Sequence, residues 1–143
     1  MTERWFPDAM PTPGVSLDTR PWWDAAAEHR LVVQTCGSCG HRHHPPSPVC
    51  PSCSSVEVTW DEVAPRGRVY TFTIVRQAFL PALGDVVPYV VAAVELDDAP
   101  GVRLFTNVVG DGALDVAIGE PVEIVFEVMG PGLAVPRARR VTP

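Results

Sequence analysis

The chain has 143 residues, 46% of them hydrophobic, which suits one ordinary globular domain or two small ones that share a core. Its formal net charge is −6 and all eleven basic residues are arginine. The charge disfavours a sequence-independent nucleic-acid binder, and the absence of lysine excludes Schiff-base chemistry and a phosphate-binding P-loop. No apolar run reaches the ~18 residues of a membrane span, and residues 1–15 lack a signal-peptide pattern, so we expect a soluble, cytoplasmic protein.

The first 17 residues predict an extended arm, because three prolines accompany Trp5 and Phe6. Such an arm is either a disordered terminus or a segment whose aromatic side chains dock on a partner.

A short helix is predicted next, over residues 20–30, where Asp18 or Thr19 can cap the first turn and Pro21 can occupy it. Trp22 and Trp23 cannot share one face, since neighbours on a helix lie about 100° apart. Both tryptophans pack against the rest of this chain, or one of them contributes to a surface for a partner or ligand.

The stretch C-G-S-C-G-H-R-H-H-P-P-S-P-V-C-P-S-C, residues 36–53, is the most specific local signal. Two C-x-x-C pairs in a reducing compartment more often bind metal than form disulfides. Four thiolates at roughly 2.3 Å make a closed tetrahedral zinc site, with iron as the minor alternative. Because a catalytic zinc keeps an open position, we expect one structural Zn²⁺ per chain. Its ligands would be Cys36, Cys39, Cys50 and Cys53.

The three histidines between the pairs, His41, His43 and His44, are predicted to be spare and partly solvated on the hairpin between the two pairs. Strands flank the cysteines: L-V-V-Q-T leads in, and V-E-V-T-W leads out with a period of two.

The remainder of the chain predicts a mainly β fold. Five strands are expected, the last less clearly because it contains Pro136. Their number and the longer link before the fourth indicate a small five-stranded Greek-key barrel of the OB type, with an SH3-like barrel as the competitor. The strands are predicted at residues 68–76, 88–96, 102–109, 121–128 and 134–141. The predicted organisation is an arm and helix (1–30), a zinc ribbon (31–62) and an OB-fold barrel (63–143).

Catalytic motifs are scarce, and no catalytic residue is assigned. Three glutamates, Glu120, Glu123 and Glu127, are expected on the polar side of the fourth strand and its approach. The basic cluster Arg137, Arg139 and Arg140 is either a solvated edge or a contact for an anion such as a coenzyme A phosphate. In the loop 79–85, Phe79 and Leu80 either pack at the barrel end or contact a ligand.

The order of features resembles a family of two-part proteins with a short helix, a rubredoxin-like zinc ribbon and an OB-fold barrel, long known only as a domain of unknown function. The resemblance covers about residues 20–141. One departure is His44, where an apolar or aromatic residue commonly precedes the two prolines. The resemblance rests on P-W-W-D-A, H-R-L-V-V-Q-T-C, the ribbon cysteines with P-P-S-P-V, G-R-V-Y-T-F-T-I-V, V-P-Y-V-V-A-A-V-E-L-D and I-G-E-P-V-E-I-V-F.

The resemblance implies an accessory role, in hetero-oligomers with thiolase-like aldolases or thiolases or, as runner-up, with hot-dog-fold enoyl-CoA hydratases. Such complexes act on acyl-CoA thioesters in steroid side-chain or lipid degradation, and the accessory protein can contact the acyl-CoA. The partner or ligand contacts we assign are Trp5, Trp22, Trp23, Phe79, Arg137, Arg139 and Arg140.

Two other functions remain open. An OB barrel can bind single-stranded nucleic acid through aromatic platforms, here Tyr70, Phe72, Tyr89 or Phe105. Against this, residues 63–143 hold seven arginines and nine acidic residues, a net charge of −2. A free-standing enzyme would need a nucleophile or an acid–base pair that the sequence does not announce.

Overall fold

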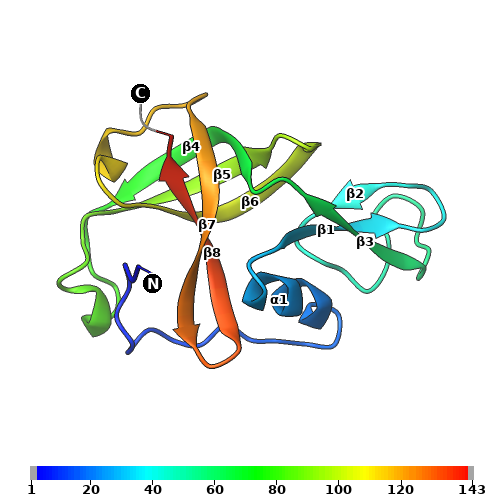
Figure 1. The fold of residues 1–143 in the computed structure, drawn as a ribbon, viewed down its shortest axis with the longest axis horizontal. Helices are drawn as coiled ribbons and strands as arrows, with labels where there is room; N and C mark the ends of the chain where they lie inside the picture. The colour runs from blue at the N-terminus through cyan, green and yellow to red at the C-terminus, as the bar shows by residue number, and fades with distance from the viewer. Residues whose placement is uncertain (1–2, 142–143) are drawn as a thin grey trace.

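The computed structural model describes residues 3–141 and is mainly β, with one short α-helix (Figure 1). The elements, in chain order, are α1 (Arg20–Ala27), β1 (Leu31–Cys36), β2 (Arg42–His43), β3 (Val58–Val63), β4 (Arg66–Val75), the 3₁₀ turn η1 (Pro81–Leu83), β5 (Tyr89–Leu96), β6 (Ala99–Val109), the 3₁₀ turn η2 (Ala113–Asp115), β7 (Pro121–Gly130) and β8 (Leu133–Arg140).

A small antiparallel sheet forms the ribbon, with strand order β2-β1-β3. The central strand β1 is almost entirely buried, whereas β3 is mostly exposed. Gln34, buried in β1, exchanges two hydrogen bonds with the backbone of Ser47, at 2.9 and 2.7 Å. These bonds fasten the proline-rich loop between the cysteine pairs to the sheet.

The second unit is a closed five-stranded barrel of order β4-β5-β6-β8-β7, which confirms the predicted OB-type architecture. Neighbouring strands are antiparallel except β6 and β8, which pair in parallel at Val108–Ala138 and Val109–Arg139. Pro136 is tolerated inside β8 because the ladder to β6 involves only residues further along the strand. The core is rich in β-branched side chains, including Val69, Val90, Val94, Val122 and Ile124.

The helix α1 lies between the ribbon and the barrel and contacts β1 and β8 (Figure 1). It ends at Ala27, three residues earlier than predicted, because His29 adopts the left-handed conformation with φ 59°. Trp22 is buried in the core, whereas Trp23 is half-buried and meets Trp22 edge-on, with ring centroids 4.8 Å apart. Both tryptophans therefore pack against the core of this chain, and a contact of either one with a partner or ligand stays a prediction.

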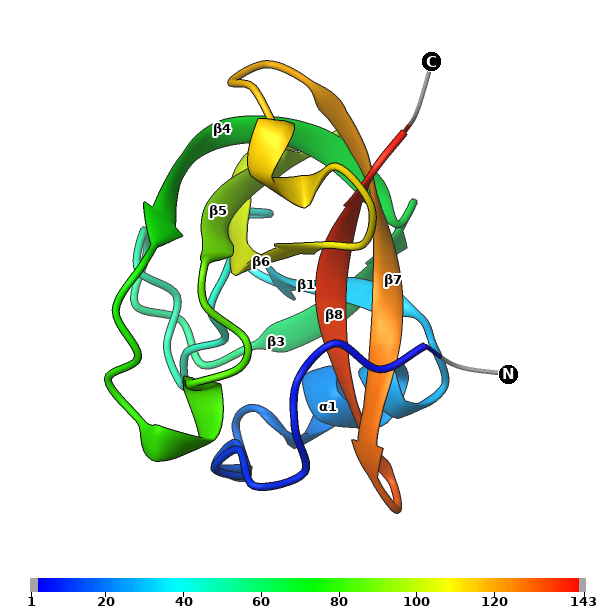
Figure 2. The same cartoon turned by 90° about the vertical axis from the view of Figure 1, so that its left-hand side faces the viewer.

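The amino-terminal arm packs against the barrel instead of forming the disordered terminus that was one of its two alternatives, and docking of its aromatic side chains on a partner stays a prediction. Figure 2 shows the arm crossing β7 and β8. Phe6 is buried with Leu83 of η1 and Val109 of β6, and Tyr89 meets its ring edge-on at 6.0 Å.

Among residues 3–141, no helix is long and apolar enough to cross a bilayer. The chain passes from ribbon to barrel between β3 and β4, while the three-part division into 1–30, 31–62 and 63–143 stays a prediction.

Candidate metal centre and contact surfaces

The first cysteine pair forms a tight turn at the end of β1. The N–H groups of Ser38 and Cys39 both donate to Sγ of Cys36, at 3.4 Å, and the N–H of Gly40 donates to the Cys36 carbonyl at 2.9 Å. Gly40 has φ 77°, a conformation that glycine adopts without a steric cost. The turn therefore directs both sulfurs toward the second pair.

The second pair repeats this geometry. The N–H of Ser52 donates to Sγ of Cys50 at 3.3 Å, and the N–H of Ser54 donates to the Cys50 carbonyl at 2.9 Å. Ser54 occupies the position equivalent to Gly40 and is also left-handed, with φ 66°. Two turns of the same shape thus face each other across the ribbon.

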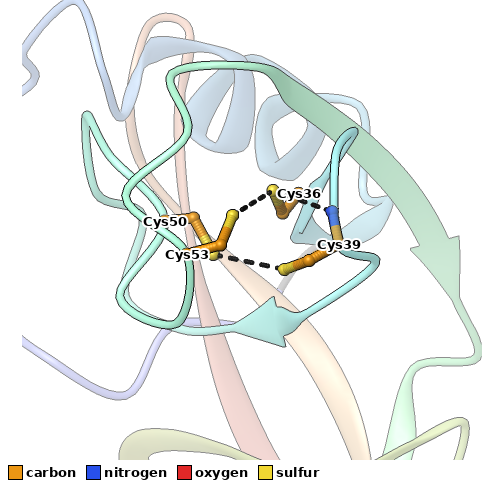
Figure 3. Close-up of side chains that lie close together, drawn as sticks. All are labelled: Cys36, Cys39, Cys50 and Cys53. Carbon is orange, nitrogen blue, oxygen red and sulfur yellow. Dashed lines mark hydrogen bonds between the residues drawn. The ribbon is translucent and has the colours of Figure 1, made fainter.

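The four sulfurs converge on one point (Figure 3) and all lie within 4.8 Å of one another. Sγ of Cys36 is 3.6 Å from Sγ of Cys53, and Sγ of Cys39 is 3.7 Å from Sγ of Cys50. A tetrahedral Zn²⁺ with bonds of roughly 2.3 Å separates its sulfurs by about 3.8 Å. All four thiols are free of disulfides, so the cluster fits one tetrahedral ion.

The electrostatics of the cluster also favour a cation. The N–H of Cys39 lowers the pKa of the Cys36 thiol to about 6, aided by the N–H of Ser38 and opposed by burial. The N–H of Ser55 also lowers the pKa of Cys53, but the three other sulfurs and burial together raise it to about 12. Protein groups alone therefore do not hold four thiolates together, whereas a divalent metal ion would.

The three histidines lie outside this cluster. His41 and His43 stack with ring centroids 5.7 Å apart, and the two ring nitrogens of the half-buried His43 are covered but have no hydrogen-bond partner among the described residues. His44 packs on Trp22 at 5.3 Å, and burial, followed by the charge of His43, lowers its pKa to about 4. His44 therefore joins the ribbon to α1 as a neutral ring.

The arginine cluster is paired with carboxylates of the barrel. Arg139 contacts Glu123 at 2.9 Å, and Arg140 donates to both oxygens of Glu120, at 2.9 and 2.5 Å. Arg137 is buried and donates through Nε to Glu127 at 2.9 Å. An anion at this edge would have to compete with these carboxylates, and an anion contact through any of the three arginines stays a prediction.

Glu127 departs most from expectation, because its side chain is fully buried instead of facing solvent. One carboxylate oxygen accepts the N–H groups of Trp5 and Phe6, and the other accepts Arg137. The Arg137 guanidinium lies 4.3 Å from the Phe6 ring centroid and also donates to Asn107 at 2.9 Å. A buried ion pair thus fastens the arm to the outside of the barrel.

The other predicted contact residues differ in how much surface they offer. Phe79 is 73% exposed at the tip of the loop before η1, while Trp5 is half-buried at the edge of the arm. Trp22 is buried within the chain and presents little surface to a partner. Their role in binding stays a prediction.

Sequence reasoning missed Glu127 as an anchor for the arm. Glu127 lies on the outward side of β7, where alternation correctly predicts a polar residue. The only hint was the pair of aromatic residues at positions 5 and 6, which need apolar surface to cover them.

Two family models match consecutive parts of the chain. Residues 23–58 match the zinc ribbon described as "ChsH2, rubredoxin-like zinc ribbon domain". Residues 60–127 match the barrel described as "ChsH2, C-terminal OB-fold domain". The first match supports zinc as the ion that the four cysteines are positioned to bind.

Curated relatives include the probable enoyl-CoA hydratase alpha subunit of Thermomonospora curvata, 39% identical over 135 residues, which are 93% of this chain and 40% of the relative. The 3-oxo-4,17-pregnadiene-20-carboxyl-CoA hydratase alpha subunit of Mycobacterium tuberculosis is 36% identical over 84% of this chain and 37% of the relative. The chain therefore spans about two fifths of the length of these relatives.

Among solved structures, the chain is similar to one described as "Ltp2-ChsH2(DUF35) aldolase", with a TM-score of 0.80 and 37% identity. The match covers 92% of this chain and 100% of that one. The two family models match the ribbon and the barrel in the order in which they follow along this chain. The chain thus belongs to the ChsH2-type DUF35 family, in which a rubredoxin-like zinc ribbon precedes an OB-fold barrel.

Proposed function

We propose that the chain is a non-catalytic accessory subunit of an acyl-CoA-processing complex, in which it supports a thiolase-like aldolase or thiolase. The observation that carries the proposal is the similarity, over 92% of this chain, to the structure whose description names ChsH2(DUF35) together with an aldolase. The two hydratase relatives are also named as subunits. All three are thus named as parts of a larger enzyme.

The chemistry of the metal centre supports the same proposal. Four thiolates fill a tetrahedral coordination sphere, so the ion has no position for water or substrate. When bound, zinc would fix the two cysteine turns relative to each other and so hold the ribbon beside α1. The four cysteines act in this role as ligands only.

An aldolase or thiolase is placed before a hot-dog-fold hydratase because the solved structure that this chain resembles over 92% of its residues, with a TM-score of 0.80, is described as an aldolase. A hydratase partner remains the second candidate. Degradation of steroid side chains or other lipids fits the pregnadiene-carboxyl-CoA named in one relative.

Co-expression tests the proposal. The chain, tagged at its carboxyl terminus, would be produced together with a candidate thiolase-like protein from the same genome, and each protein would also be produced alone. We expect the two to copurify at a fixed ratio, and the partner to gain solubility or turnover in the complex. A chain that stays alone and leaves the partner's solubility and turnover unchanged would contradict the proposal.

A further inference from the structure

A groove of about 530 Å³ opens on the outside of the barrel, between the arm and the end of β6. Trp5 and Phe6 form one wall of the groove. Val86, Pro88 and Tyr89, which lie just before and at the start of β5, form the second wall, and residues 109–115 around η2 form the third. Figure 2 shows the arm on one side of this region and η2 on the other. The volume lies in the range of pockets that hold small ligands or a few side chains.

The arm wall is held in place by a specific interaction. The buried carboxylate of Glu127 accepts the backbone N–H groups of Trp5 and Phe6, and the Phe6 ring packs on Leu83 and Val109. The groove is therefore built by segments more than a hundred residues apart in sequence, and the half-buried Trp5 is fixed at its rim.

The charge of the groove has one sign. Asp111 and Asp115 are exposed at the rim, and neither side chain has a hydrogen-bond or ion-pair partner within residues 3–141. No arginine or histidine lines the groove. Arg139 and Arg140 line a neighbouring pocket that shares Trp5 and Asp111 with the groove, but their guanidinium groups are held by Glu123 and Glu120. Arg140 also lies near Asp115 and donates to the carbonyl of Gly112 at 3.0 Å.

Two features thus define the groove, namely an aromatic and aliphatic wall and two carboxylates without partners. Phosphate groups would be repelled here, so coenzyme A does not suit the groove. A guanidinium suits it well, because it can stack on an aromatic face while it pairs with a carboxylate. Arginine beside apolar side chains is also typical of the centres of protein interfaces.

We infer that this groove binds a segment of the partner enzyme in which an arginine is flanked by apolar side chains. The arginine would pair with Asp111 and Asp115 against Trp5 or Tyr89, and its neighbours would cover the exposed Leu114. The inference rests on the proposed accessory function and adds the chemistry by which the partner is recognised.

The test compares two charge-matched double variants in their affinity for the co-expressed partner. Asp111→Asn with Asp115→Asn removes the groove charges, and Asp18→Asn with Asp24→Asn removes two exposed charges at the start of α1. We expect the groove variant to bind about tenfold more weakly and the control to stay within about twofold. The difference should shrink as salt is added, since exposed charges are screened.

A photo-crosslinker placed at Leu114 gives an independent readout, and mass spectrometry identifies the partner segment that it captures. A captured segment that contains arginine supports the inference. A complex that forms normally, tolerates the groove variant and yields no crosslink at Leu114, or yields one to an acidic segment, overturns this inference alone. If the wild-type chains form no complex, the proposed function fails and the inference with it.

Discussion

The ribbon and the barrel are each stabilised by a different kind of interaction. Between residues 36 and 57 the only buried residues are Cys36 and Cys50, so this part of the ribbon has almost no apolar core of its own. The barrel, in contrast, closes its own hydrogen-bond ladder around a core rich in valine. The stability of the ribbon should therefore depend on the metal, and that of the barrel on apolar burial.

The largest expected effect is the removal of a zinc ligand. Cys50→Ser leaves three thiolates, and structural zinc contributes roughly 10–16 kcal/mol of apparent free energy that is coupled to folding. We expect loss of the metal and of native amide signals from the ribbon, while the valine signals of the barrel remain. Metal analysis and an NMR spectrum check both points. A variant that keeps one zinc, or one whose barrel unfolds together with the ribbon, would contradict the claim that only the ribbon depends on the metal.

Next in size is the removal of the carboxylate that holds the arm. Glu127→Ala leaves Arg137 buried without its ion-pair partner, which costs about 3–5 kcal/mol. Zinc content should be unchanged, while the free energy of unfolding falls and trypsin cleaves faster after Arg4. Glu127→Gln keeps the shape of the side chain and should lose less. Because both variants remove the charge, a Glu127→Gln protein as stable as the wild type would show that the charge is unimportant.

A substitution that creates a cavity in the core of the barrel provides the complementary test. Ile124 is 4% exposed within β7, and Ile124→Ala should lower the free energy of unfolding by roughly 2–5 kcal/mol. Denaturant titration measures this loss. Because the ribbon depends on its metal, the zinc stoichiometry should stay at one, and early release of zinc from the folded variant would show that ribbon and barrel are coupled.

The smallest expected effect concerns the contact between ribbon and helix. Burial lowers the pKa of His44 to about 4 from the usual value of about 6.5, so the unfolded chain binds a proton that the folded chain does not. Stability should therefore fall as the pH falls from 6.5 toward 4, by at most about 2 kcal/mol at pH 5. His44→Phe keeps the packing on Trp22 and cannot titrate. Identical pH profiles for the two proteins would contradict this assignment.

Local patterns were sufficient to predict most of the fold. Alternation over β7 and the β-branched run of β4 gave strands within a few residues of those observed, because side-chain period is a local property. The two C-x-x-C pairs likewise predicted the metal cluster, since each turn is closed by its own backbone N–H groups.

Contacts between distant segments could not be predicted in this way. Alternation places Glu127 on the outer side of β7, but only the path of the arm determines that this side is covered. The early end of α1 follows from the left-handed His29, whose ring stacks on Phe126 at 5.3 Å. The acidic groove likewise needs the arm, β5 and η2 together, and no local pattern announces it.

The most direct test of an accessory role with a structural metal is to exchange the metal and to measure how well the partner enzyme binds the chain and turns over its substrate. Purified chain would be reconstituted with cadmium in place of zinc, combined with the thiolase-like partner, and compared with the zinc form in complex formation and turnover. A structural Cys₄ site predicts equal binding and equal turnover for the two metals. Turnover that changes severalfold while the complex still forms would show that the metal takes part in the chemistry, contrary to the role proposed for it.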